Sequence, residues 1–418
     1  MKKTKWIALQ PLTGGMYIGF ANALGCDAEC IISFKGLNDG KQCEGKRSRC
    51  GNEYNLTCYL EKHNRHIPRY EFVNQGMFDN VDNPVLDGTP DFDDIDVVCA
   101  VPVCAGLSML TTTDSAAKEQ KNCNMKFLAQ YTLKKICPKV YVFENAPGFM
   151  SEKNVDLRSW FERLAYDCGY SVTYFSTDTK LHHNCQRRPR TFVVFTKWSN
   201  GPQRALKTPL WESVQYNITD MLSKIPADAT YQDSLPAPMY DNDVYIEYIK
   251  EKFGGEWKKY FTGDVMNTII KLQLATNFRD WCMTTDKVPQ VFADRMVRHI
   301  DKVIICLSEN RGWWSSTPRY YPILAPAVQS RTVLSTIHPT EDRLCSERDM
   351  LTLMGMPYDF EMQCDFMHGC RQIGQNVPVK TAEWIANVCL YIIEHINEHR
   401  DEGCQARYYD NTKQKIVH

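Results

Sequence analysis

The stretch that decides the fold is Asp96–Ser108, which reads DVVCAVPVCAGLS. Residues 97–101 form an apolar run of strand length, and Pro102 and Gly106 end it, so the chain leaves a buried strand and enters a tight loop. Cys104 lies just past the strand end. In open α/β sheets, ligands and reacting groups gather beyond the carboxyl ends of strands, where a loop exposes a thiol whose position the sheet fixes. Because free Cys is also among the most buried residue types, this stretch alone fits either a nucleophile or a small buried side chain.

Length and composition set the class of protein. The chain has 418 residues, so we expect one large domain and a smaller one. Its formal net charge is -1, so a surface for nucleic acid would have to be a local patch. The 18 Cys are scattered, which predicts reduced thiols in an intracellular protein without a disulfide framework. No segment is apolar for long enough to be a signal peptide or a membrane span, so we expect a cytoplasmic protein.

Strands and helices alternate over the first half of the chain. The patterns predict strands at 6–12, 29–35, 94–103, 139–143, 170–175 and 191–195, and helices at 16–24, 115–137 and 157–168, with a further helical face at 385–396. This order favours a mainly parallel sheet with both faces covered. After residue 198 prolines interrupt the rhythm. We therefore predict a discontinuous catalytic domain over 1–197 and 331–418, and a smaller irregular domain over 198–330.

The first strand runs into Thr13, Gly14 and Gly15, and a periodic apolar helix follows. A strand, a glycine turn and a helix open a nucleotide-type βα unit, because the glycines let a ligand approach the backbone and the helix N-terminus offers free N–H groups. Glycine pairs also occur in ordinary turns, so this signal is ambiguous alone.

Residues 36–69 are polar and rich in Gly, and they contain Cys43, Cys50, Cys58 and His63. These side chains could hold a structural zinc ion. Their spacing matches no standard zinc finger, however, and the segment has no CxxC pair. We therefore predict a solvated insertion and no metal.

Three polar clusters follow three of the predicted strands. They are Cys104, then Glu144 with Asn145, then Arg188 with Arg190. Strand-end loops of such a sheet converge on one cleft. A thiol, a carboxylate and two guanidinium groups at one place would supply a nucleophile, a proton donor and an anchor for a substrate.

The set of motifs, in this order, resembles the DNA (cytosine-5) methyltransferases. LTGGMYIG at 12–19 is similar to the cofactor loop of that family, PVCAGLS at 102–108 to its nucleophile loop, ENAPGF at 144–149 to its ENV motif, QRRPR at 186–190 to its QxRxR motif, 331–360 to the segment that supports the recognition domain, and IGQNV at 373–377 to its GNxV motif. The resemblance implies a Rossmann-like methyltransferase fold, a mixed sheet with helices on both faces, plus a smaller irregular recognition domain.

The resemblance also implies a reaction. The target cytosine is flipped out of the duplex into a pocket, because carbon 5 cannot be reached inside the base stack. Cys104 would attack carbon 6 and form a covalent adduct. Glu144 would bind ring nitrogen 3 and the amino group, Arg190 would hold the ring oxygen, and Arg188 would help to position the base or a phosphate.

The expected donor of the one-carbon group is S-adenosylmethionine. By resemblance it would be bound by Thr13, Gly14, Gly15, Lys35, Pro102, Gln375 and Asn376. Double-stranded DNA would be contacted by Ser108, Asn145, Gln186 and Arg187. We expect a monomer that works in the cytoplasm of a bacterium or of a phage-infected bacterium.

The sequence departs from the family mainly on the donor side. Leu12 stands where the cofactor loop usually has its first Gly, and Lys35 stands where an acidic residue usually binds the ribose hydroxyls. Val103, Ala105 and Gln375 are further departures. A carboxylated S-adenosylmethionine would suit Lys35, and methylenetetrahydrofolate, which leaves a hydroxymethyl group, would suit a lost nucleoside pocket. We expect S-adenosylmethionine. The alternatives are these two donors, a non-catalytic DNA-binding homologue, and modification of RNA, since one branch of the family acts on transfer RNA.

Overall fold

The computed structural model describes residues 3–40, 50–79, 81–103, 107, 115–198, 217–225, 268–286, 319–320, 325–328, 336–341, 345–364, 366–396 and 406–410, together with scattered positions between 248 and 309. Everything below refers to these residues. Cys104, Ser108 and Cys43 lie outside them.

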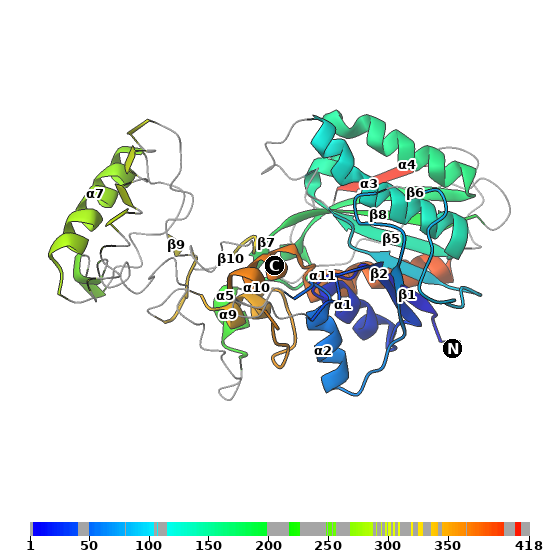
Figure 1. The fold of residues 1–418 in the computed structure, drawn as a ribbon, viewed down its shortest axis with the longest axis horizontal. Helices are drawn as coiled ribbons and strands as arrows, with labels where there is room; N and C mark the ends of the chain where they lie inside the picture. Colours follow the sequence, from blue (N-terminus) through cyan, green and yellow to red (C-terminus); the bar gives the residue numbers. More distant parts are fainter. Residues whose placement is uncertain are drawn as a thin grey trace.

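The centre of the molecule is a sheet whose eight described strands run in the order β12-β6-β8-β5-β4-β1-β2-β3 (Figure 1). The strands are β1 (Trp6–Leu9), β2 (Cys30–Phe34), β3 (Arg69–Phe72), β4 (Val97–Ala100), β5 (Val140–Asn145), β6 (Tyr170–Asp178), β8 (Pro189–Lys197) and β12 (Ala406–Asp410). All described pairs are parallel except those of β8, which runs antiparallel to β5 and β6. The predicted mixed α/β sheet is confirmed.

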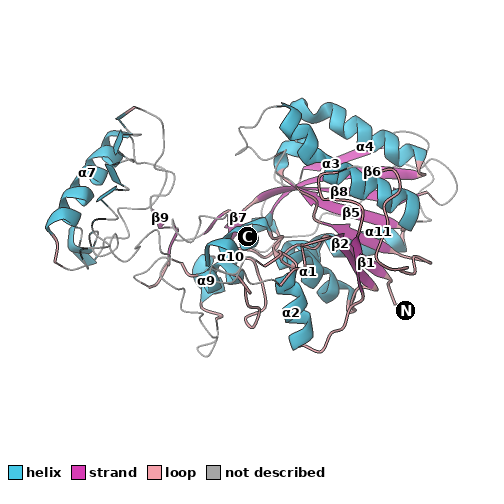
Figure 2. Ribbon diagram, viewed as in Figure 1, coloured by secondary structure: helices cyan, strands magenta, loops and turns pink. Residues whose placement is uncertain are grey.

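Helices cover both faces of the sheet (Figure 2). The helices that cover the sheet are α1 (Gly15–Leu24), α2 (Tyr54–Lys62), α3 (Ser115–Tyr131), α4 (Val155–Asp167) and α11 (Val379–Glu394). Side chains of α1, α2 and α11 pack on one face with Val97, Val140 and Phe192, whereas those of α3 and α4 pack on the other with Val98, Tyr141 and Phe195. Two separate apolar cores therefore hold the sheet from both sides.

Further described elements connect these strands and helices or extend the chain beyond them. They are the π-helix η1 (Thr132–Ile136), the 3-10 helices η2 (Pro147–Met150), η3 (Glu152–Asn154) and η4 (Thr179–Leu181), the helices α5 (Ile218–Leu222), α9 (Glu347–Leu353) and α10 (Phe366–Gln375), and the short strands β7 (Gln186–Arg187), β9 (Arg319–Tyr320), β10 (Ala325–Pro326) and β11 (Thr336–Ile337). The helix predicted at 115–137 is thus α3 continued by η1.

Two strands differ in length from the prediction in ways that matter for the site. β1 ends at Leu9, because Gln10 and Leu12 adopt the left-handed region, with φ of 45° and 52°. β5 extends to Asn145, so Glu144 lies within the strand and not in the loop after it. Pairing with Phe192 of the neighbouring β8 therefore fixes the backbone of Glu144.

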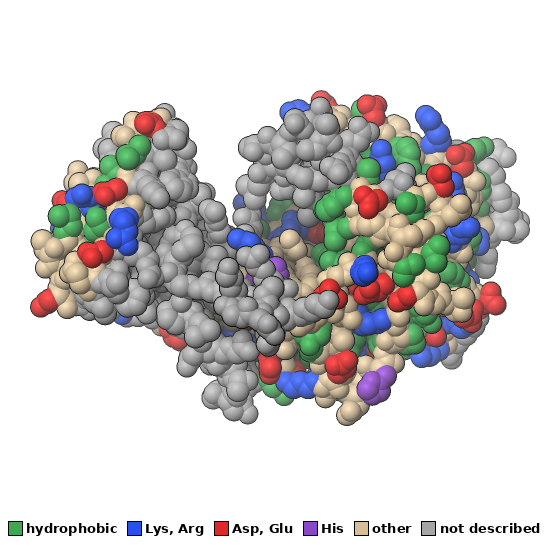
Figure 3. Space-filling view, viewed as in Figure 1, with side chains coloured by type: hydrophobic (Ala, Val, Ile, Leu, Met, Phe, Trp, Pro, Cys, Tyr) green, Lys and Arg blue, Asp and Glu red, His purple; other side chains and the backbone are tan. Residues whose placement is uncertain are grey.

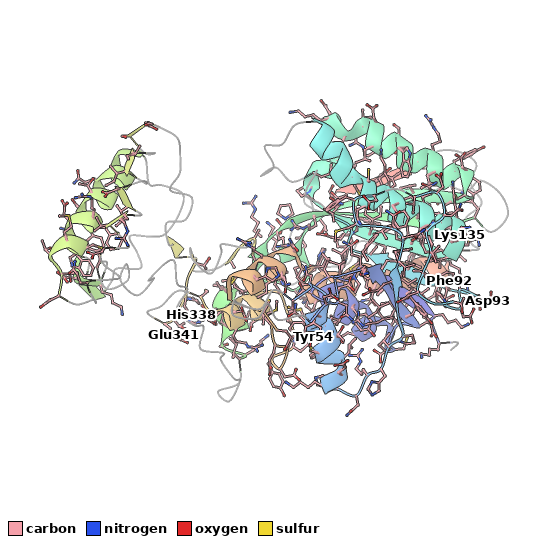
Figure 4. All side chains as sticks on the ribbon, in the orientation of Figure 1. Tyr54, Phe92, Asp93, Lys135, His338 and Glu341 are labelled. Carbon is pink, nitrogen blue, oxygen red and sulfur yellow. The ribbon has the colours of Figure 1, made fainter. Side chains whose placement is uncertain are left out.

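The prediction of a solvated insertion at 36–69 does not hold for its second half. Residues 54–62 form α2, and Leu56 and Leu60 are buried in the core against α1. Tyr54, labelled in Figure 4, begins this helix. The sequence pattern did not predict this helix, because α2 has only nine residues and few of them are apolar.

Most of the predicted recognition domain, 198–330, lies outside the described residues, and its boundaries stay a prediction. Of its described parts, Ile218 and Leu222 of α5 belong to the core of the catalytic body, as do Ala325 and Val328. The helix α7 (Thr268–Thr284) is drawn apart from the sheet in Figure 1. Within the described part of the chain, no helix has both the length and the apolar character needed to cross a membrane.

Candidate functional site

Glu144 and Arg190 meet at the carboxyl edge of the sheet. Glu144 pairs with Phe192 across the antiparallel β5 and β8, so Arg190, two residues from Phe192, is its diagonal neighbour on the same face. The Nε of Arg190 lies 2.5 Å from the Oε1 of Glu144, and both side chains are largely buried, with 18% and 5% exposed. The Nη1 of Arg190 donates to the carbonyl of Pro189 at 2.7 Å. Among the described residues, nothing is bonded to Arg190 Nη2 or Glu144 Oε2, so each side chain keeps one polar atom for a ligand.

The loop predicted to carry the nucleophile starts beside Glu144. Ala100, the last residue of β4, pairs with Phe143 of β5. Val103, which precedes Cys104, donates its N–H to the side chain of Asn124 at 2.9 Å. At the other end of the loop, Leu107 is buried. Val103 and Leu107, the described residues on either side of 104–106, thus lie at the end of the sheet that carries Glu144.

Arg188 is held differently from the expectation that it positions a base or a phosphate. Its side chain is buried and donates to the carbonyl of Val328 at 2.5 Å and to those of Gly374 and Asn376, each at 2.9 Å. Its own N–H donates to Asp178 at 2.9 Å. Arg188 therefore ties β8 to two distant segments, and we assign it a structural role.

Gln186 and Asn145, both expected to contact DNA, are fully buried. The amide of Gln186 donates to the carbonyl of Leu353 at 2.8 Å and accepts from the N–H of Val328 at 3.1 Å. The Oδ1 of Asn145 accepts the N–H of Ala146 at 2.8 Å. The structure corrects this expectation, because side chains bonded inside the core cannot reach DNA.

Arg187, the other described residue expected at the DNA, is exposed. Its side chain is 73% accessible, and its Nε is 3.9 Å from Asp178. A long exposed cation at the edge that carries Glu144 and Arg190 is suited to a backbone phosphate. Elsewhere on the face shown in Figure 3, the coloured basic and acidic side chains are interspersed, in keeping with the net charge of -1.

The glycine loop and the C-terminal motif are in direct contact, as residues of one site should be. The N–H of Gly15 donates to Asn376 Oδ1 at 2.8 Å. A Cβ on Gly15 would lie 1.9 Å from the carbonyl oxygen of Val377, and a Cβ on Gly14 would lie 2.8 Å from Leu56. Gly15 is thus required by packing, and Gly14 by its φ of +113°, a backbone conformation that other residues rarely adopt.

Side-chain amides surround the same loop. Thr13 is fully buried and donates to Asn52 Oδ1 at 2.5 Å, and Asn52 donates to Gln375 Oε1 at 2.9 Å. Asn55 donates to Gln372 at 2.7 Å. The start of α2 and the end of α10 therefore hold Thr13 and Gln375 together through a polar network.

A buried carboxylate lies beneath the loop. Glu53 is fully buried, accepts from the hydroxyl of Ser33 at 2.7 Å, and has its Oε2 3.7 Å from Arg69. Burial raises the pKa of Glu53 to about 7, against the lowering effects of Arg69, of Ser33 and of a hydrogen bond from the N–H of Leu12. Its Oε2 makes no hydrogen bond within the described residues, so this carboxylate supports the loop through Leu12 and keeps one acceptor for a ligand.

No three His, Cys, Asp or Glu side chains in the described ranges are grouped as a metal site. Cys50 is buried, and Cys58 lies on α2. His63 bonds to Asp359 at 2.7 Å through its Nε2. Cys43 lies outside the described residues, so the absence of a zinc site at these four residues stays a prediction.

The family model for C-5 cytosine-specific DNA methylases matches residues 48–390. The chain belongs to this family. Its members are enzymes, and the predicted resemblance to the cytosine-5 DNA methylases is confirmed.

A solved structure supports the fold of this DNA methylase, and a second one matches it more weakly. A DNA modification methyltransferase encoded within an E. coli prophage matches 94% of the chain with 99% of its own, at 17% identity and a TM-score of 0.52. The Dnmt2 methyltransferase of S. pombe matches 93% of the chain with 98% of its own, at 13% identity and a TM-score of 0.45. None of the curated proteins matches the sequence.

Membership of the DNA methylase family implies S-adenosylmethionine as donor, and the donor-side residues can be compared with that molecule. The side chain at the end of β2 is the exposed Lys35, so no carboxylate faces the ribose hydroxyls there. Glu53, a buried acid at the same loop, is bonded to Ser33 through its Oε1, while its Oε2 makes no hydrogen bond within the described residues. The described residues therefore offer no carboxylate at the end of β2, but Glu53 could supply one for the ribose of S-adenosylmethionine through its Oε2.

Several polar residues of this site carried no signal in the sequence. Gln10, Asn52, Glu53 and Asn124 are all fully or almost fully buried, yet none belongs to a recognised motif. The sequence indicated their burial only where a polar residue lies next to apolar positions of a helix, as Asn124 does before the buried Met125.

Proposed function

We propose that this DNA methylase transfers a one-carbon group to carbon 5 of cytosine in double-stranded DNA through a covalent adduct with Cys104. The observation that carries the proposal is the buried Glu144–Arg190 pair, 2.5 Å apart, at the strand ends where the Cys104 loop begins. A base flipped from the duplex needs groups that bind its polar edge, and these two side chains offer them.

In the first step the thiolate of Cys104 adds to carbon 6. The S–C6 bond forms while the electron pair of the C5=C6 double bond moves to carbon 5 and into the ring. Glu144 lowers the energy of this intermediate, because its carboxyl group accepts from the 4-amino group and shares a proton with nitrogen 3. We assign this contact to Oε2, the oxygen of Glu144 that is not bonded to Arg190.

Arg190 acts on the opposite part of the same edge. Its Nε holds Glu144 in place, and its Nη2 is the atom that we assign to the ring oxygen of cytosine. A charge-assisted hydrogen bond there stabilises the electron density that the thiolate brings into the ring. One side chain thus orients the acid and binds the base.

Carbon 5 uses its electron pair to bond the one-carbon group that the donor would supply. In the last step carbon 5 loses its proton to solvent, the electron pair of that C–H bond restores the C5=C6 double bond, and the C6–S bond breaks to release the thiolate of Cys104. The one-carbon group is supplied by the donor. S-adenosylmethionine is the donor that the family implies and the one we expect. Lys35 favours testing two others, a carboxylated S-adenosylmethionine and methylenetetrahydrofolate.

DNA would be held by Arg187 near the base and by the recognition domain at 198–330, which reads the sequence in the major groove. A non-catalytic homologue would keep these contacts without forming the adduct. The Glu144–Arg190 pair argues against this, because a protein that merely binds DNA has no need of a buried acid beside the Cys104 loop.

The experiment that tests the proposal incubates the full-length protein and DNA with each donor separately and weighs the nucleosides after hydrolysis. We expect 5-methylcytosine from S-adenosylmethionine. 5-Hydroxymethylcytosine from methylenetetrahydrofolate, or 5-carboxymethylcytosine from the carboxylated donor, would show that the donor is not S-adenosylmethionine. The proposed reaction at carbon 5 of cytosine would stand. Unmodified cytosine with every donor would contradict the proposed function.

A further inference from the structure

Asn124 of α3 has no part in the chemistry above, yet it is a fully buried polar side chain beside the site. We propose that Asn124 is a positioning residue that fixes the Cys104 loop and holds it in register with the loop that follows β1. The inference rests on the proposed function for its catalytic consequence, although the contacts that carry it are independent of any substrate.

Both halves of the Asn124 amide are used. Its Oδ1 accepts the N–H of Val103 at 2.9 Å, and its Nδ2 donates to Gln10 Oε1 at 3.1 Å. An amide carries an acceptor and a donor on one rigid plane, so the same group can bond to both partners. Loss of this side chain would leave the Val103 donor and the buried Gln10 acceptor without these bonds, which is costly away from water.

The described residues on either side of 104–106 are both held by contacts within the protein. Asn124 holds the N–H of Val103, immediately before Cys104. After it, the backbone of Leu107 packs on Gly148, where a Cβ would come within 2.2 Å of the Leu107 carbonyl oxygen. Gly148 belongs to η2, which directly follows Glu144 and β5. The two restraints relate the Cys104 loop to the strand that carries the acid.

Gln10, the other partner in the hydrogen bond with Asn124, is also held firmly by its surroundings. This residue is fully buried with φ of 45°, a backbone conformation that is uncommon for side chains other than Gly. Its N–H donates to Ile32 at 2.9 Å. Such conformations persist where the surroundings determine them, and they cluster at functional sites. The amide pair thus joins the exits of β1 and β4, which are neighbours in the sheet.

The test uses the full-length protein with Asn124→Ala, Asn124→Asp, Gln10→Glu and the double variant. In Asn124→Asp, the carboxylate still accepts from Val103, and the Gln10 amide can turn over to donate to it. In Gln10→Glu, the new carboxylate still accepts from Asn124. The double variant sets two carboxylates against each other. Tyr170→Phe is the matched control, because it removes a buried hydrogen bond to Pro138, 2.7 Å long, at the amino end of β6.

Two readouts separate positioning from general stability. The first is the alkylation rate of Cys104 as a function of pH, measured by mass spectrometry, with the exposed Cys137 as internal reference. The second is kcat and KM for DNA. We expect Asn124→Ala to change Cys104 alkylation at least about threefold and to lower kcat about tenfold to 100-fold at nearly constant KM. The single conservative variants should stay close to wild type, and the double variant should resemble Asn124→Ala.

The inference is overturned if Asn124→Ala matches Tyr170→Phe in alkylation profile and kcat. It is also overturned if the loss of kcat in the double variant is only the sum of the losses in Asn124→Asp and Gln10→Glu. If the wild-type protein makes no modified cytosine, the proposed function fails, whereas the alkylation comparison still decides whether Asn124 holds the loop.

Discussion

The Nε of Arg190 lies 2.5 Å from the Oε1 of Glu144, and the two residues are diagonal neighbours on antiparallel strands. The guanidinium of Arg190 compensates the charge of the Glu144 carboxylate, which is only 5% exposed. One polar atom on each side chain is left for a bound base. Stability and substrate binding thus depend on the same contact.

Removing one member should therefore have two effects. Arg190→Met leaves a buried carboxylate without its cation, so we expect a lower melting temperature and a loss of turnover of roughly 100-fold or more. Glu144→Gln keeps the shape and should lose turnover to a similar degree with little change in melting temperature. Single-turnover rates and thermal unfolding measure the two effects, and equal rates in wild type and Glu144→Gln would contradict the role of the acid.

Arg188 should behave as a structural residue. Its guanidinium donates to three main-chain carbonyls, which a Lys ammonium cannot reproduce. We expect Arg188→Lys to lower the free energy of unfolding by roughly 2–4 kcal/mol. Urea denaturation measures it, with Arg187→Ala as the exposed control that should change little. If Arg188→Lys is as stable as the wild-type protein but fails to bind DNA, Arg188 would instead contact a base or a phosphate, as the sequence predicted.

Arg187 should contribute to DNA affinity without sequence preference. Removal of one phosphate contact lowers the salt dependence of binding, so the slope of log K against log salt should fall by about 0.9 in Arg187→Ala. Binding measured at several salt concentrations tests this. An unchanged slope would show that Arg187 is not at the DNA backbone.

Gly15 should tolerate no side chain. A Cβ there would lie 1.9 Å from the Val377 carbonyl oxygen, and relief would require movement of the segment before α11. We expect Gly15→Ala to cost roughly 3 kcal/mol. Gly25→Ala is the matched control: it has no atom within 4 Å of the new Cβ, but a φ of +65°, so it should cost about 1 kcal/mol. Denaturant titrations of both variants measure the difference; similar costs would mean that the contact of Gly15 with Val377 is loose.

Glu53 should make stability depend on pH. Its pKa is about 7 in the folded protein against an ordinary value of 4.5, so between these values the native state keeps a proton that the unfolded state has lost. The free energy of unfolding should therefore fall as pH rises through this window, by roughly 3 kcal/mol in all, and then become constant. Glu53→Gln should remove this part of the pH dependence, with Arg69, Ser33 and Glu71 unchanged around it. A slope that survives the substitution would have to come from another group.

The sequence predicted the sheet well because apolar runs and helical periods report burial directly. It placed Glu144 and Arg190 together because strand ends share an edge. It placed Gln186 and Asn145 wrongly at the DNA, because a motif shows that a residue is needed and not whether it bonds to the ligand or to the backbone. It also missed Asn124 and α2, since a buried amide or a short helix among polar residues leaves no periodic trace.

The most direct test of the central claim is the intact mass of the protein after incubation with S-adenosylmethionine and DNA that contains 5-fluorocytosine. Fluorine replaces the proton that must leave carbon 5, so the adduct cannot resolve. We expect a covalent protein–DNA species in the wild-type protein and none in Cys104→Ala. A wild-type protein that methylates cytosine yet forms no such species, or a Cys104→Ala variant with full turnover, would contradict the adduct.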